Sequence, residues 1–133
     1  MLELLRTLIV STLIVVCLAA CNRTQPVYTV EDSRIPKPSE GLTLDQIKDN
    51  IIQAALDKGW HVDEVGPGEL RVMLKWKDHS AISSIFYNKK SYSIKLDSSR
   101  NLKEQNGQIH RKYNQEVQAL EAEIDKRLYR PAH

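Results

Sequence analysis

The sequence predicts an α+β domain: one antiparallel sheet of three or four strands, with an N-terminal helix and a longer C-terminal helix packed on one face. Three observations predict it. An amphipathic helical stripe follows Leu42, short segments of alternating apolar and polar residues come next, and a second helical stripe lies near the C-terminus. Helices on one sheet face would bury both stripes in a single core.

The first helix is predicted to begin at Leu44. Thr43 and Gln46 match a capping box, in which each side chain bonds the backbone N–H of the other residue. A core-facing stripe follows, made of Leu44, Ile47, Ile51, Ala54 and Ala55. Gly59 suits the left-handed residue that follows a helix end, so we expect the helix to stop there.

Alternation then predicts two strands around a turn at Gly66-Pro67-Gly68. Trp60 and Val62 indicate a short strand before the turn. The clearest strand in the chain follows the turn, because its apolar and polar residues alternate strictly. Its predicted inner face holds Leu70, Val72, Leu74 and Trp76, and its predicted outer face holds Arg71, Met73, Lys75 and Lys77.

A hairpin is predicted next. Asp78-His79-Ser80 is interpreted as a turn, and residues 81–87 and 92–96 pair around Asn88-Lys89-Lys90. If Tyr87 pairs with Tyr92, one face of the hairpin is apolar. That face would hold Ile85, Tyr87, Tyr92, Ile94 and Leu96.

A polar loop is predicted from Asp97 to Gln108, followed by the longer helix. Its apolar residues recur at spacings of 4, 4, 3, 4 and 4, which is typical of one helix face. They are Ile109, Tyr113, Val117, Leu120, Ile124 and Leu128. Lys126 and Arg127 complement the helix dipole in the last turns, and Pro131 ends the helix.

The first twenty residues have the organisation of an export signal. Residues 1–6 are weakly positive, residues 7–17 are mostly apolar, and Leu18-Ala19-Ala20 is a small-residue cleavage stretch. Leu18-Ala19-Ala20-Cys21 resembles the lipobox of bacterial lipoproteins, which implies cleavage before Cys21 and lipid attachment to it. Two alternatives stay open: an uncleaved signal anchor, and an ordinary signal peptide that leaves Cys21 as a free thiol.

The lipobox resemblance implies a protein anchored to the cell membrane through its N-terminal lipid. Asn22 follows the cysteine, where Asp would favour the inner membrane, so we expect the outer membrane, facing the periplasm. The predicted domains are a signal peptide at 1–20, a lipidated cysteine with a flexible proline-containing tether at 21–41, and the α+β domain at 42–130. Val27-Tyr28-Thr29-Val30 is the one part of the tether that could form a strand or dock.

Composition excludes several classes of function. With 19 Lys and Arg against 17 Asp and Glu, the chain is nearly neutral, which argues against nucleic acid as a partner. Cys17 leaves with the leader and Cys21 is consumed by lipid, so no disulfide or thiol chemistry is expected.

Candidate catalytic and metal-binding patterns are weak. His61 and Asp63 would share a strand face, but no third ligand has recognisable spacing. Asp78-His79-Ser80 has the residue types of a hydrolase triad, yet adjacent residues point in different directions. Glu116, Glu121, Glu123 and Asp125 are interpreted as a solvated helix face. No catalytic residue, metal, cofactor or small-molecule substrate is therefore predicted.

One surface is suggestive. Cationic residues mixed with exposed apolar ones on the outer sheet face suit a partner better than plain solvent, although a solvated face is an ordinary alternative. The candidate binding surface comprises Arg71, Met73, Lys75, Lys77, Phe86 and Lys95, with Ile82 among them.

The part after the leader also resembles a group of small proteobacterial lipoproteins to which no activity is assigned. The residues that carry the resemblance are Lys58-Gly59-Trp60, Ser91-Tyr92-Ser93-Ile94 with Asp97-Ser98, and residues 109–114. The favoured hypothesis is a non-enzymatic interaction or scaffold domain that holds a protein partner in the periplasm. The alternative is a binder of an anionic envelope polymer, either cell wall or lipopolysaccharide, through the basic sheet face.

Overall fold

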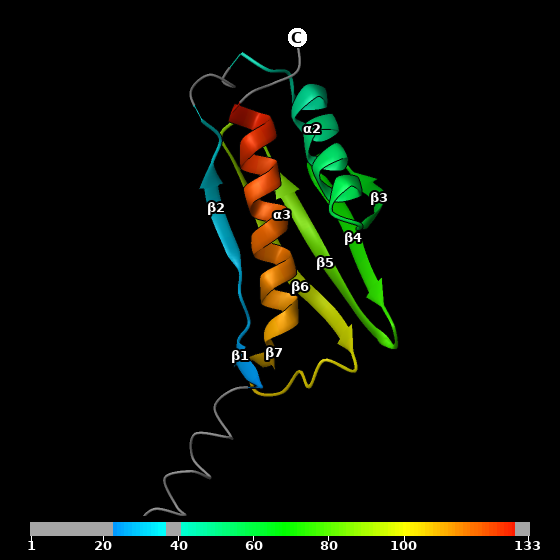
Figure 1. The fold of residues 1–133 in the computed structure, drawn as a ribbon. Coiled ribbons are helices and arrows are strands. Elements are labelled where there is room, and N and C mark those ends of the chain that lie inside the picture. Colours follow the sequence, from blue (N-terminus) through cyan, green and yellow to red (C-terminus); the bar gives the residue numbers. More distant parts are fainter. Residues whose placement is uncertain (1–22, 37–40, 130–133) are drawn as a thin grey trace, which may run out of the picture.

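The computed structural model describes residues 23–36 and 41–129 and confirms the α+β class. A five-stranded antiparallel sheet has the strand order β2-β6-β5-β4-β3, and a two-stranded sheet, β1-β7, lies at one end of the domain. Helices α2 and α3 cover the same face of the large sheet (Figure 1). The sheet is therefore larger than the three or four strands predicted.

Helix α2 (Leu44–Asp57) forms as its sequence predicts. The Thr43 hydroxyl accepts from the Gln46 backbone N–H at 3.1 Å, and the Gln46 side chain accepts from the Thr43 N–H at 2.9 Å. Gly59 has a φ of 83°, which glycine adopts without strain. The Trp60 N–H then donates to the Ala55 carbonyl at 2.9 Å, and this bond brings the buried Trp60 side chain back against the helix.

Four consecutive strands form an antiparallel meander. They are β3 (His61–Gly66), β4 (Glu69–Trp76), β5 (His79–Tyr87) and β6 (Ser91–Arg100). Tyr87 pairs with Tyr92 as predicted, and Ile85 pairs with Ile94 beside them on the buried face. The predicted turn at 78–80 is wrong in part, because Lys77 and Asp78 form the turn whereas His79 and Ser80 already belong to β5.

The polar loop predicted at 97–108 is shorter in the structure. Strand β6 continues to Arg100 through a bulge, and β7 (Gln108–His110) precedes α3 (Arg111–Tyr129). Ile109 is fully buried as expected, but it lies on β7 and not on the helix. The spacing of Ile109 is compatible with a place on the helix or on the strand before it, because a buried residue just before a helix can continue the apolar stripe of that helix.

The tether predicted at 21–41 is wrong for most of its length. Strand β1 (Thr24–Pro26) pairs with β7, and β2 (Val30–Arg34) pairs with β6 at the edge of the large sheet. Val30 and Ile35 are only 3% and 6% exposed. Asp32, with a φ of 46°, lies in an irregular part of β2, and this break in the alternation hides the strand from sequence analysis.

Polar contacts from α3 hold this segment in place. The Asn114 side chain accepts from the Tyr28 N–H at 2.9 Å and donates to the Pro26 carbonyl at 2.9 Å. The Tyr28 hydroxyl donates to Glu121 at 2.7 Å. Residues 24–35 are therefore part of the folded domain.

The core lies between the large sheet and the two helices. It includes Trp60, Tyr92 and Tyr113 together with aliphatic residues of both predicted helical stripes. Neither helix that the structure describes is long and apolar enough to cross a lipid bilayer.

Candidate functional site

The outer face of the large sheet is the face that α2 and α3 leave uncovered (Figure 1). Strand register places most of the predicted binding surface on it. Arg71 pairs with Ser84 and Met73 with Ile82 between β4 and β5, and Ser84 pairs with Lys95 of β6. The structure thus brings Arg71, Met73, Lys75, Phe86 and Lys95 together as predicted from the alternation of the strands.

Apolar side chains occupy the middle strands of this face. Phe86 is 41% exposed and Met73 is 36% exposed, while Ile82, opposite Met73, is half-buried. Burying such side chains contributes about 25 cal/mol for each Å² of apolar surface removed from water. The face therefore has apolar area that a partner can cover.

Lys77 does not belong to this surface. It lies in the turn between β4 and β5 with a φ of 52°, so it continues the sequence alternation but not the strand. Arg100, which the sequence analysis omitted, is on the face instead, because β6 extends further than predicted and pairs Arg100 with Ser80.

The charge of the face is mixed, which sequence analysis missed. Asp63 pairs with Arg71, and Glu69 pairs with Phe86. Asp97 accepts a hydrogen bond from the Ser84 hydroxyl at 2.6 Å. The strand alternation already placed Asp63 and Glu69 on this side, so the signal was present. These carboxylates offset part of the positive charge of Arg71, Lys75, Lys95 and Arg100.

Cys21, the predicted lipid attachment site, lies outside the described residues. Its acylation and the cleavage site before it remain predictions.

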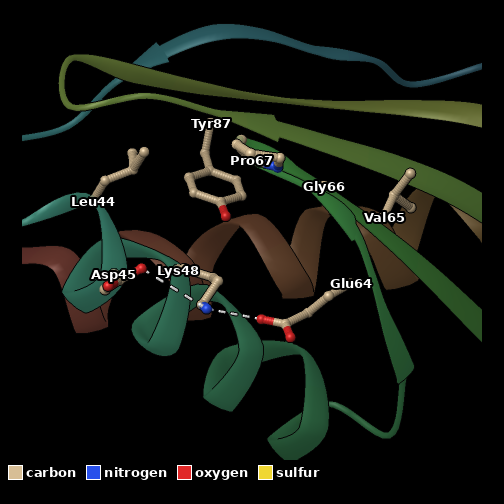
Figure 2. Close-up of a pocket in the computed structure, with 9 residues that line it drawn as sticks. Leu44, Asp45, Lys48, Glu64, Val65, Gly66, Pro67 and Tyr87 are labelled. Carbon is tan, nitrogen blue, oxygen red and sulfur yellow. Dashed lines mark ion pairs between the residues drawn. The ribbon is translucent and has the colours of Figure 1, made fainter.

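A pocket of about 400 Å³ lies between α2 and the turn that joins β3 to β4. Figure 2 shows Tyr87 pointing into it from the sheet, while Lys48 of α2 meets Glu64 of β3 on its other side. Lys48 forms an ion pair with Glu64 at 2.9 Å. The hydrogen bond to Glu64 and its charge raise the pKa of Lys48, so this amine stays protonated at neutral pH.

Three tyrosines with shifted acidity lie between the sheet and α3. Hydrogen bonding to Glu121 raises the pKa of Tyr28, and burial raises the pKa of Tyr92, which donates to Asp125 at 2.6 Å. Burial also raises the pKa of Tyr113 to about 12. Each phenol therefore stays protonated at neutral pH, and these groups act in packing and hydrogen bonding.

Among the described residues, each of the two histidines singled out in the sequence lies beside one aspartate and does not join a larger cluster. His61 Nε2 lies 3.4 Å from Asp63 on the exposed face of β3. His79 Nε2 lies 3.4 Å from Asp78, and its Nδ1 lies 2.6 Å from the Asn101 carbonyl. Within residues 23–36 and 41–129, no three His, Cys, Asp or Glu side chains are grouped as metal ligands.

His110 caps the start of α3. Its Nδ1 accepts from the Lys112 backbone N–H at 3.2 Å, which satisfies one of the N–H groups left without a partner at a helix start. Burial lowers the pKa of His110, and the charges of Lys103, His79 and Arg111 lower it further. Only the neutral ring can accept this hydrogen bond.

His110 makes the stability of the domain depend on pH. The unfolded ring has a pKa of about 6.5, and the folded ring binds a proton less readily. Its contribution is therefore complete above about pH 6.5 and is lost as the pH falls below that value. Urea unfolding at pH 7.5 and 5.5 should show wild type losing more stability than His110→Asn, whose side chain caps without titrating. Equal losses in both proteins would contradict this role.

Comparison with known proteins adds no assignment. The chain matches no protein-family model, and no curated protein matches it. The resemblance to small proteobacterial lipoproteins therefore remains an expectation based on the residues given above.

Proposed function

We propose that this chain is a lipoprotein of the cell envelope whose domain binds a protein partner without catalysing a reaction. The lipid on Cys21 would hold it in the membrane, with the outer membrane facing the periplasm as the favoured location. The observation that carries the proposal is the open sheet face, where Phe86 and Met73 are exposed among Arg71, Lys75 and Lys95.

The partner that best fits this surface has apolar side chains flanked by carboxylates. The apolar residues lie on the central strands β4 and β5, and the cations lie around them. Interfaces commonly have this arrangement of an apolar centre and a polar rim. The carboxylates Asp63, Glu69 and Asp97 favour a protein over an anionic polymer, because they would repel a continuous negative charge.

The proposal is tested by crosslinking in intact cells from a photoreactive residue at position 82, with mass spectrometry of the products. We expect Phe86→Ser with Lys95→Glu to reduce the crosslinked partner at least tenfold, because exposed aromatic anchors dominate binding energy. Leu56→Ser with Lys126→Glu is the matched control, since it removes an exposed apolar residue and a cation from the helices. Equal loss in both double variants, or no loss in either, would remove the sheet face from consideration.

The salt dependence of binding distinguishes a protein partner from an anionic polymer. A contact centred on apolar residues should persist when the captured complex is washed in about 0.5 M salt, whereas binding through exposed cations alone is screened. Complete release at this salt concentration, with wall or lipopolysaccharide fragments in the eluate, would favour the polymer.

A further inference from the structure

Strand β1 is the first described element after Cys21 in the sequence, and it pairs with β7 at one end of the domain (Figure 1). Only Asn22 and Arg23 separate Cys21 from Thr24, the first residue of β1. Three residue steps span at most about 10 Å. A lipid on Cys21 therefore keeps this end of the domain close to the bilayer surface, whereas a tether of about 20 residues would have left the domain free to turn.

We define the anchor end as residues 23–26, 77–79 and 100–112, which the structure brings together. Thr24 pairs with His110, the His110 N–H donates to the Leu102 carbonyl at 2.8 Å, and the Asn101 side chain donates to Asp78 at 2.6 Å. Strand β1, the β4–β5 turn, the loop before β7 and the start of α3 thus form one continuous surface.

Positive charge is concentrated on the anchor end. It has six Lys and Arg against two carboxylates, while the rest of the chain has 13 Lys and Arg against 15 Asp and Glu. Lys112 pairs with Glu116 at 2.8 Å, and among the residues that the structure describes none of the other five is in an ion pair. The six are Arg23, Lys77, Arg100, Lys103, Arg111 and Lys112.

A pocket of about 200 Å³ lies within this surface. His79, His110, Arg111 and Lys112 line it together with Trp76. Because His110 Nδ1 accepts from a backbone N–H, the proton of the neutral ring is on Nε2, where it is available as a donor. The volume is several times the roughly 30 Å³ that one water molecule occupies, so a phosphate group fits.

We infer that the anchor end rests on the bilayer and binds the phosphate groups of anionic lipids in the surrounding leaflet. The inference rests on the proposed lipidation of Cys21, which supplies the short connection to the membrane. Cations at a negatively charged bilayer surface are attracted to it, and this end has both the charge and the position that such attraction requires. The contact would also orient the domain, with the sheet face standing away from the plane of the membrane.

The test uses the mature protein purified from membranes, after mass spectrometry has shown that Cys21 is acylated. Absence of the acyl group would overturn the anchoring part of the proposed function, separately from the lipid contact. The acylated protein is placed in nanodiscs of phosphatidylcholine alone or with about 30% phosphatidylglycerol, and amide hydrogen exchange is measured. We expect exchange across residues 100–112 to slow at least tenfold with phosphatidylglycerol, and exchange across 88–91 to stay unchanged.

Lys103→Glu with Arg111→Glu should abolish this protection. Each cation strengthens binding to an anionic membrane surface about fivefold, and a carboxylate in its place is repelled. Lys89→Glu with Lys90→Glu, which reverses two charges in the far hairpin, should retain it. Unfolding curves show whether each variant is folded. If Lys103→Glu with Arg111→Glu is misfolded, Lys103→Gln with Arg111→Gln is used in its place. Equal exchange in both kinds of nanodisc would overturn the inference.

Two further additions identify the source of the phosphate. Inorganic phosphate added to phosphatidylcholine nanodiscs should not reproduce the protection, because it lacks the surrounding charged surface. Soluble cell-wall fragments should not reproduce it either. Protection by free phosphate or wall fragments that matches the effect of phosphatidylglycerol would contradict binding to membrane lipid.

Discussion

Val30→Asp is expected to lower the free energy of unfolding by about 3–5 kcal/mol, the range for placing an unpaired charge in a core. Val30 is 3% exposed and pairs with Ile94 on the buried face of the large sheet. A carboxylate there would lose its water without gaining a cation. Urea unfolding of the mature protein, followed by tryptophan fluorescence, measures the change.

Thr29→Asp is the matched control, because residue 29 is exposed and lies just before β2. We expect it to change stability by less than about 0.5 kcal/mol. If Val30→Asp were as mild as Thr29→Asp, residues 24–35 would behave as the flexible tether that the sequence predicted, and the short connection to the membrane would not exist.

Asn114→Leu is expected to lower the free energy of unfolding by about 1–3 kcal/mol, because it removes two partly buried hydrogen bonds, each of which contributes about 0.5–1.5 kcal/mol. The substitution keeps the size of the side chain but removes both of its hydrogen-bonding groups. The groups left behind are the Tyr28 N–H and the Pro26 carbonyl, which bond Asn114 at 2.9 Å each. Urea unfolding measures the total loss of stability, and hydrogen exchange at residues 24–34 shows whether this segment detaches before the rest of the domain unfolds.

Gln118→Leu serves as the control on the exposed side of α3 and should be nearly neutral. Global destabilisation with unchanged protection of residues 24–34, relative to the rest of the domain, would show that Asn114 supports the core but does not hold the N-terminal segment. Stability equal to wild type would show that these hydrogen bonds contribute nothing.

The elements that could be predicted are those whose apolar periodicity is long or strict. The capping box at Thr43, the stripe from Ile47 to Ala55, and the pairing of Tyr87 with Tyr92 all occur in the structure. Local hydrogen bonding and side-chain spacing determine these features, and both can be read over a few residues. Strands β1 and β2 were missed because they are short and β2 is irregular, so their burial depends on β6, β7 and α3 far along the chain.

The candidate site was predicted in part for the same reason. Arg71, Met73 and Lys75 occupy alternate positions of one strand, and this spacing by itself places them on one face of the sheet. The error at Lys77 and the omission of Arg100 both concern the ends of strands, where alternation in the sequence continues past the last hydrogen-bonded pair or stops before it. The alternation also places Asp63 and Glu69 on this face, so part of its negative charge could have been predicted, whereas the hydrogen bond between Ser84 and Asp97 is seen only in the structure.

By itself, the sequence determined the α+β class, the helix cap, the faces of the central strands and the expectation of a lipid on Cys21, because each depends on neighbouring residues. Only the tertiary structure decided that the segment after Cys21 belongs to the sheets and that cations from residues 23, 77 and 100–112 gather beside it. The physical reason is that both depend on contacts between residues far apart in the sequence, such as Asn114 with Pro26 for the burial of this segment and Thr24 with His110 for the gathering of the cations.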